Sequence, residues 1–243
     1  MKIRKIAPAG EGALVVMFEE KIDQMTNQKV QFLYRKLRKL KIKGLKEGIP
    51  SYCSLLLFYD PMVISYNKLR FIITRTREEK QSMELSENKI VEIPVCYGGS
   101  FGEDLETVAA YSGLSQEEVV TIHTQTCYPV YMVGFLPGFP YLGGLDSRIH
   151  TPRLANPRIE IPAGSVGIGG EQTGVYPLAS PGGWQLIGRT PLKLYDSSLA
   201  DPVMLRAGDS VRFVKITPNE YEEIANQMKR ESDSGKALLG GVL

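Results

Sequence analysis

The chain has 243 residues, of which 43% are hydrophobic and 23% charged, and its 29 Lys and Arg nearly balance its 27 Asp and Glu. This composition is typical of a soluble globular protein with one large domain or two ordinary ones. The near-neutral charge, with no recognised nucleic-acid-binding motif, argues against a nucleic-acid partner.

Hydrophobic stretches do not point to a membrane. The charge-free span 124–145 is a poor membrane helix because three prolines and four glycines interrupt it. The first ten residues contain lysines but no apolar core of signal-peptide length, so we expect a cytoplasmic protein. Cys53, Cys96 and Cys127 are spaced for neither a disulfide framework nor a zinc site. We therefore expect no metal and three reduced thiols, mostly in the core.

The first 90 residues alternate between patterns of strands and helices. The predicted elements are a strand at 13–18, a helix around 30–40, a strand at 51–60, a helix within 65–80 and a strand at 89–97. Lysines and arginines are dense in residues 34–48, and the helical spacing of the apolar residues predicts that they form the solvated face of the first helix. The order of these elements predicts a ferredoxin-like α/β sandwich.

Charge divides the chain into two parts. Residues 1–80 hold 17 Lys and Arg against 8 Asp and Glu, whereas the remaining residues hold 12 against 19. The polar segment 80–89 has no strong period and is the candidate linker. We therefore expect an N-terminal domain over residues 1–85 and a second domain over 86–243.

The second domain has a different character. Ser115 with Glu118, and Thr217 with Glu220, form capping boxes that predict the start of two helices. Between these helices, residues 134–191 contain 12 of the 24 glycines and 8 of the 15 prolines. This density of turn residues around short apolar runs predicts a β-barrel with tight turns, so the chain as a whole is predicted to be α+β.

The glycine-rich stretch 164–191 could be a phosphate loop or part of a β-built pocket. A Walker loop needs a Lys followed by Ser or Thr after its last glycine, and this stretch has no such pair. A dinucleotide fingerprint that starts at Gly167 would need a third glycine where Gln172 stands. The prolines that follow cannot open a helix. The sequence therefore favours the β-built pocket.

His123 and Arg189 are the candidate catalytic residues. His123 ends a predicted helix, where its imidazole could act as an acid or base near neutral pH or could be hydrogen-bonded in the core. Arg189 could hold a carboxylate or phosphate through its guanidinium, or equally a loop carbonyl. Aromatic residues that cluster around glycines are core residues by default but also suit a pocket, and they include Phe135, Phe139, Tyr176 and Trp184.

Two long motifs carry a resemblance to a known family. They are GFLPGFPYLGGLD (Gly134 to Asp146), with the preceding His123, and PRIEIPAGSVGIGGEQTGVYPLASPGGWQLIGRTP (Pro157 to Pro191). Both closely resemble the 5-oxoprolinase B-subunit family, also called KipI or allophanate hydrolase subunit 1. The resemblance covers most of the chain and implies an N-terminal α/β domain followed by a C-terminal cyclophilin-like β-barrel.

The resemblance also implies an activity. It implies that the chain works with subunits A and C to hydrolyse 5-oxo-L-proline to L-glutamate while ATP becomes ADP and phosphate. Because no ATP loop is recognisable, we expect the nucleotide chemistry to lie partly or wholly on another subunit and the isolated chain to be inactive. The substrate or partner pocket implied by the resemblance is lined by His123, Phe135, Phe139, Gln172, Tyr176, Ser180, Trp184 and Arg189.

A second role is implied for the same family. It is the inhibition of a sporulation sensor histidine kinase, in which the C-terminal domain binds the kinase and blocks its autophosphorylation. The two roles are not exclusive, since one exposed aromatic surface could serve either partner.

Overall fold

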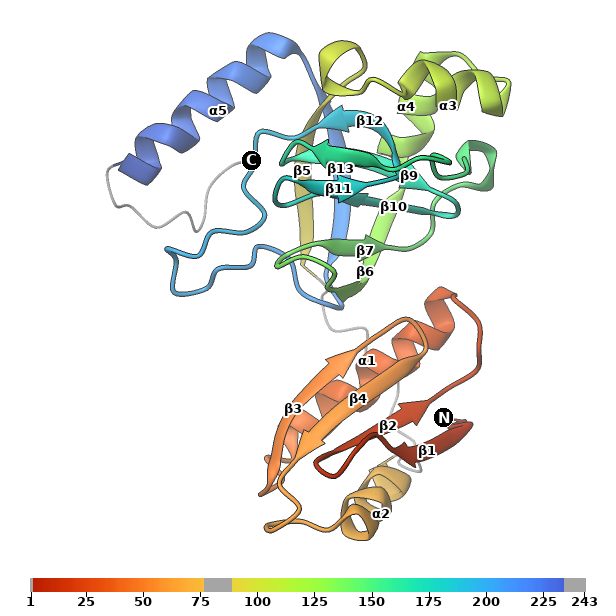
Figure 1. Ribbon diagram of the computed structural model, residues 1–243, viewed down its shortest axis with the longest axis vertical. Helices are drawn as coiled ribbons and strands as arrows, with labels where there is room; N and C mark the ends of the chain where they lie inside the picture. Colours follow the sequence, from red (N-terminus) through yellow and green to blue (C-terminus); the bar gives the residue numbers. More distant parts are fainter. Residues whose placement is uncertain (1, 77–88, 234–243) are drawn as a thin grey trace. The chain divides into compact units, whose positions relative to one another are not determined.

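A computed structural model describes residues 2–76 and 89–233 of the chain. The chain divides into two compact units, Met1–Asn88 and Lys89–Leu243 (Figure 1). The boundary predicted after residue 85 lies outside the described residues, as does the predicted linker 80–89 except for its last residue.

The N-terminal unit is a four-stranded antiparallel sheet with two helices. The strand order is β1-β2-β4-β3. Both helices contribute to one apolar cluster with strands β2 and β4, and therefore cover the same face of the sheet. The elements are β1 (Lys5–Pro8), β2 (Ala13–Met17), α1 (Gln24–Lys39), β3 (Leu45–Pro50), β4 (Ser54–Tyr59) and α2 (Tyr66–Thr76).

Helix α1 confirms the helix predicted from spacing. Val30, Leu33 and Leu37 are fully buried against the sheet. The Asp23 carboxylate accepts the Thr26 N–H at 2.7 Å and so caps the first turn. Basic side chains gather in the last turn of the helix, where they interact favourably with the negative end of the helix dipole.

The ferredoxin-like part of the predicted fold is not confirmed. Strands β1 and β3 were not predicted, because neither has the apolar alternation of a strand buried on one face. The strand predicted at 89–97 was wrongly placed in this sheet. It is β5 (Ile90–Tyr97), which pairs with barrel strands in the second unit.

The second unit is built on a closed barrel, as predicted. In the described part of the chain, seven strands close in the order β10-β7-β6-β13-β5-β12-β9, and β13 with β5 is the parallel pair. The strands are β5, β6 (Cys127–Val133), β7 (Pro140–Leu142), β9 (Ser165–Gly169), β10 (Gln172–Val175), β12 (Gln185–Arg189) and β13 (Ser210–Ile216).

Further elements surround the barrel (Figure 1). A two-stranded ribbon pairs β8 (Arg158–Ile161) with β11 (Ser180–Gly182). The helices are η1 (Gly99–Phe101), α3 (Leu105–Ser112), α4 (Gln116–Gln125), η2 (Ser147–Ile149) and α5 (Pro218–Asp233). Both predicted capping boxes are present, since Ser115 and Glu118 bond reciprocally before α4, and Thr217 and Glu220 do so before α5. The fold is thus mixed α and β.

Two other predictions, on membrane helices and on the cysteines, can be compared with the structure. None of the helices within residues 2–76 and 89–233 is long and apolar enough to cross a membrane. The three cysteines are free thiols, but only Cys96 is buried, while Cys53 is partly exposed and Cys127 exposed. The prediction of mostly core cysteines was therefore wrong, because Cys127 stands at the exposed first position of β6.

Candidate functional site

Two glycines of the 164–191 stretch, Gly169 and Gly174, let the indole ring of Trp184 lie directly against the strand backbones. A Cβ atom added at Gly169 would overlap with Nε1 of Trp184 and lie 2.6 Å from its Cδ1. A Cβ at Gly174 would lie 3.1 Å from Cζ3 of the same ring and 3.3 Å from Phe139. Strands β9 and β10 therefore use glycine so that a large aromatic ring can lie close to their backbones.

An aromatic cluster forms around Phe139, outside the barrel core. Its ring lies 5.2 Å from that of Tyr176, 5.6 Å from Trp184 and 5.0 Å from Tyr141. Phe135 contacts Phe139 edge-on at 5.7 Å, with a left-handed backbone (φ 68°) and 65% of its surface exposed. We call Phe135, Phe139, Tyr141, Tyr176 and Trp184 the aromatic site. Four of these five residues belong to the predicted pocket.

An ion pair fastens the β8–β11 ribbon to the barrel beside this site. Arg158 Nη2 donates to Asp104 Oδ1 at 2.7 Å, and Arg158 Nη1 lies 3.4 Å from the Trp184 carbonyl oxygen. Asp104 Oδ2 accepts the backbone N–H of Leu186 at 2.6 Å. The carboxylate is 11% exposed and the arginine side chain 25% exposed. One carboxylate thus joins β8, β12 and the start of α3.

Arg153 is a charged residue at the aromatic site that the sequence analysis did not identify. Its guanidinium carbon lies 5.7 Å from the centre of the Trp184 ring. The side chain is exposed, and its charge acts on the hydroxyls of Tyr141 and Tyr176. The surrounding letters, HTPRLANPR, contain no pattern that selects Arg153 over Arg158.

Burial keeps both tyrosines of the site protonated. It raises the pKa of Tyr176 to about 12 and also raises the pKa of Tyr141, and the nearby Arg153 opposes the rise at both residues. Both phenols are therefore hydrogen-bond donors at physiological pH.

Two polar atoms near the ribbon are buried and have no hydrogen-bond partner among the described residues. They are Oγ of Ser180, on β11, and Oε1 of Gln185, at the start of β12. Gln185 Nε2 donates to the Pro152 carbonyl at 3.0 Å, so the amide cannot turn round without losing that bond. Gln172, another member of the predicted pocket, begins β10 and is half-buried.

His123 lies inside the barrel and not at the aromatic site. It is fully buried, and its ring stacks on Phe213 at 4.5 Å. Thr173 Oγ1 donates to the Gly167 carbonyl at 3.0 Å, so it must accept the proton of His123 Nε2, 2.9 Å away. His123 Nδ1 then accepts from the Tyr97 hydroxyl at 2.8 Å. In this arrangement the imidazole is neutral and reaches no solvent-borne substrate.

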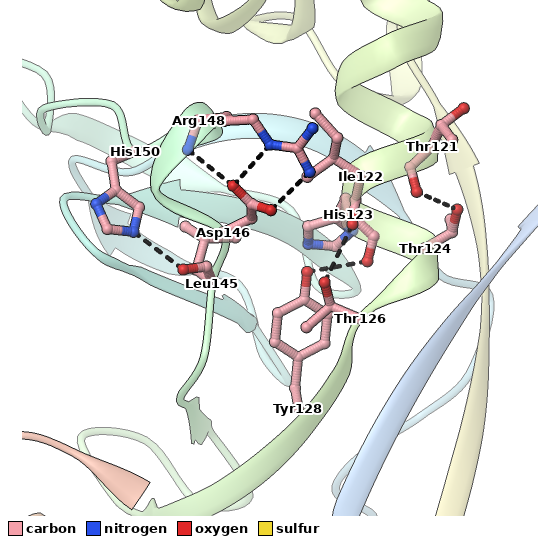
Figure 2. A network of polar contacts seen from close by, with 10 residues as sticks. All are labelled: Thr121, Ile122, His123, Thr124, Thr126, Tyr128, Leu145, Asp146, Arg148 and His150. Atoms are coloured by element: carbon pink, nitrogen blue, oxygen red, sulfur yellow. Dashed lines mark hydrogen bonds and ion pairs between the residues drawn. The ribbon is translucent and has the colours of Figure 1, made fainter.

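The end of α4 and the loop after β7 carry further polar contacts around His123 (Figure 2). The Tyr128 hydroxyl donates to the His123 carbonyl at 2.9 Å. In the loop, Arg148 donates to Asp146 from both its backbone and its side chain, which lowers the pKa of that carboxyl to about 2. The His150 ring is 3.1 Å from the Leu145 carbonyl. These bonds fix the loop and the end of α4.

We expect His123 to make the barrel unit less stable in acid. Burial lowers its pKa to about 3, against about 6.5 in an unfolded chain. Above pH 6.5 the imidazole is neutral in both states and adds no pH dependence. Below it, the unfolded state binds a proton that the folded state excludes, so stability falls until about pH 3. At pH 5 this loss is about 2 kcal/mol.

Urea unfolding at pH 7.5, 6 and 5 measures this effect, with the fluorescence of Trp184, the single tryptophan, as the signal of the barrel unit. His123→Gln should flatten the pH dependence over this window. His150→Gln is the matched control and should keep it, because His123 is still present. Equal dependence in all three proteins would contradict the prediction.

Arg189 lies at the other end of β12 from Trp184. It pairs with Ser165 of β9 and Cys96 of β5, so these three side chains share one face of the sheet. Arg189 Nε and Ser165 Oγ are buried without hydrogen-bond partners among the described residues, and Tyr221 of α5 lies within electrostatic reach of Arg189. A surface hollow of about 510 Å³ nearby is lined by Cys96, the turn 98–101 and the start of α5.

The predicted pocket is therefore distributed over three places. Phe135, Phe139, Tyr176 and Trp184 lie together, and Arg189 lies at the far end of β12. His123 is in the barrel core behind β10, where Thr173 faces inward to it and the next residue, Gly174, faces outward to Trp184.

Known proteins share both the sequence pattern and the fold of this chain. Residues 4–205 match the family described as carboxyltransferase domain, subdomain C and D. The Kluyveromyces lactis urea carboxylase shares the fold, with a TM-score of 0.69 and 22% identity over 96% of this chain and 24% of that chain. The chain is thus a carboxyltransferase-domain protein.

Two further comparisons are closer in sequence. The B subunit of the Bacillus subtilis 5-oxoprolinase is 47% identical over 228 residues, which are 89% of this chain and 95% of that protein. The crystal structure of TTHA0988 is 37% identical, with a TM-score of 0.74, and the match covers 84% of this chain but only 40% of that longer chain. The chain belongs to the 5-oxoprolinase B-subunit family, which confirms the resemblance seen in its motifs.

Proposed function

We propose that this protein is the B subunit of a 5-oxoprolinase complex. The observation that carries the proposal is the 47% identity to the Bacillus subtilis protein of that name over nearly the full length of both chains. The complex would hydrolyse 5-oxo-L-proline to L-glutamate as ATP is converted to ADP and phosphate. Subunits A and C would be its partners.

The chemistry supports a division of labour among subunits. A lactam carbonyl is a poor electrophile, and transfer of a phosphoryl group to the amide oxygen would make it easier to open. Positioned cations and backbone donors usually hold the phosphates in such reactions. The glycines that might have formed a phosphate loop instead pack against Trp184. ATP would therefore be held partly or wholly on another subunit, as a cosubstrate of the complex.

The second unit would supply the surface for substrate or partner. Its barrel would be of the cyclophilin-like kind. The aromatic site joins large apolar rings with phenol donors and one exposed guanidinium, a combination that suits a small polar ring compound.

Reconstitution tests this proposal. The chain, co-expressed with the candidate A and C subunits of its own genome, should release glutamate and ADP from 5-oxo-L-proline and ATP in equal amounts. The chain alone, and the A and C subunits without it, should each give no turnover above background. Turnover by the chain alone, or full activity without it, would contradict the subunit role.

The predicted acid/base role of His123 and anion role of Arg189 belong to the same experiment. Arg189→Ala should cost the complex most of its turnover if Arg189 holds an anion, whereas His123→Ala is expected to act through the packing of the barrel core, because the imidazole is fully buried and both of its nitrogens are bonded. A doubly substituted complex with intact turnover would remove both residues from the site. Arg212→Ala, which changes an exposed arginine paired with Glu92, is the control for Arg189.

A further inference from the structure

The loop between β6 and β7 holds Phe135 in a strained backbone conformation. The Leu136 N–H donates to the Gly134 carbonyl at 2.9 Å, which closes a γ-turn with Phe135 at its centre, and the φ of Phe135 is 68°. A γ-turn with positive φ is rare, and a bulky side chain is disfavoured in this region. Two further backbone bonds, between Gly134 and Phe139 and between Phe139 and Leu136, fix the loop. The backbone that carries Phe135 is therefore held in one conformation.

Packing within the described part of the protein does not explain this strain. The Phe135 side chain is 65% exposed, and its ring meets that of Phe139 edge-on, with the ring centres 5.7 Å apart. Its neighbour Leu136 packs against the aromatic cluster around Phe139 instead. Strained residues persist where function requires them, and an aromatic ring presented by a rigid loop loses little entropy when it binds. The strain thus points to a contact that the described residues do not supply.

The rings behind Phe135 are packed together, so this part of the molecule presents its outer rim to a partner. The side chains of Phe139 and Trp184 are only 2% and 4% exposed. Ile159, on β8, is 92% exposed, whereas Ile161 is fully buried in the same cluster. Alternation along the strand points both isoleucines to the same side of β8. Ile159 therefore extends the rim of the cluster as a second exposed apolar side chain.

Arg153 adds a positive charge to the same rim. Its guanidinium carbon is 5.7 Å from the centre of the Trp184 ring, and the side chain is exposed. Within residues 2–76 and 89–233 it makes no ion pair or hydrogen bond, whereas Arg148, Arg158 and Arg212 each pair with a carboxylate. Stacking on Trp184 restricts its orientation, which lowers the entropy that binding would cost. An acidic group on a partner would therefore complement this part of the rim.

We propose that Phe135, Ile159 and Arg153 form a docking patch for a partner subunit of the 5-oxoprolinase complex. Phe135 enters an apolar pocket of that subunit, Ile159 packs at the edge of the pocket, and Arg153 pairs with a carboxylate beside it. Aromatic and arginine side chains are enriched in protein interfaces, and the charge of Arg153 selects an acidic neighbour. The inference rests on the proposed function, because the partner is a subunit of that complex. It goes further by naming the surface and the chemistry of its counterpart.

Calorimetric titration of the purified chain with the separately purified A and C subunits tests the patch. Phe135→Ser should weaken binding to the partner subunit about thirtyfold or more, the usual effect of losing an anchor residue. Tyr111→Ser is the matched control, because Tyr111 on α3 is 63% exposed, and it should change the Kd less than about threefold. Phe135→Gly should weaken binding as much as Phe135→Ser without lowering the urea midpoint of the chain, because glycine adopts positive φ without strain.

Salt dependence tests the contribution of Arg153. Wild-type binding should weaken as the ionic strength rises, because an ion pair across the interface is screened. Arg153→Gln should weaken binding about threefold to tenfold and reduce this salt dependence. Arg212→Gln, at an exposed arginine that pairs with Glu92, should do neither. Wild-type and Arg153→Gln proteins with the same Kd and the same salt dependence would remove the ion pair from the patch and overturn the acidic counterpart.

The outcomes separate this inference from the proposed function. If the wild-type chain binds a subunit and supports turnover, and Phe135→Ser binds as tightly, the docking patch is overturned while the subunit role stands. Equal weakening by Phe135→Ser and Tyr111→Ser would also overturn the patch, because the effect would not be specific to it. A wild-type chain that neither binds the subunits nor supports turnover of 5-oxo-L-proline with them would overturn the proposed function, and this inference with it.

Discussion

Replacement of Asp104 by alanine is expected to lower the free energy of unfolding of the barrel unit by about 3–5 kcal/mol. The carboxylate accepts two bonds, from Arg158 and from the backbone N–H of Leu186. Its removal leaves a guanidinium that is 25% exposed without its closest partner, and a buried N–H without an acceptor. Glu103, 3.8 Å from Arg158, can replace part of the interaction, which favours the lower end of the range.

Guanidinium-induced unfolding followed by Trp184 fluorescence measures this loss in the barrel unit alone, since the sequence has one tryptophan. Glu103→Ala is the matched control and should cost less than about 1 kcal/mol, because Glu103 is exposed and its contact is long. In the double variant Asp104→Ala/Arg158→Met the cost should fall, because no unpaired charge is left. Similar costs for Asp104→Ala and Glu103→Ala would show that the pair does not hold the ribbon.

The parts of the fold that could be predicted are those with local signals. Helices α1, α4 and α5 have apolar spacing or capping residues within a few positions of their ends. Strand β3 has no such signal, because it is an edge strand whose Lys46 and Glu47 are exposed. The pairing of β5 depends on β13, far along the chain, where Arg212 lies opposite Glu92. Local pattern can identify a strand like β5 but cannot assign it to a sheet.

The candidate site, like the fold, could be predicted only where the sequence carries a local signal. Aromatic residues concentrated among glycines indicated that rings would meet, and Phe139, Tyr176 and Trp184 do meet. The positions of His123 and Arg189 depend on which face of a strand each neighbour presents, which spacing in the sequence cannot give. Arg153 is notable only because the fold brings Trp184 under it. The kinase-inhibitor role stays a prediction, since an exposed aromatic such as Phe135 does not specify a partner.

We expect Gly169→Ala to displace the Trp184 ring and to cost about 2–3 kcal/mol of stability. The new methyl group would overlap with Nε1 of the indole and would lie 2.6 Å from Cε2. The backbone of Gly169 needs no left-handed conformation, so any effect comes from this contact. The indole is 4% exposed and packs against Phe139 and Tyr176, so it cannot move without opening the aromatic site. Its fluorescence should shift to the red as water gains access.

Gly134→Ala gives the matched comparison. Gly134 precedes Phe135 at the same site, but an added Cβ there would meet only Met132 Cε, at an ordinary 3.5 Å. This variant should keep the wild-type spectrum and lose less than about 1 kcal/mol. If Gly169→Ala changed neither fluorescence nor stability, the indole would not need the flat strand surface. If both variants behave as expected, Gly169 is required because the indole ring of Trp184 lies against its backbone.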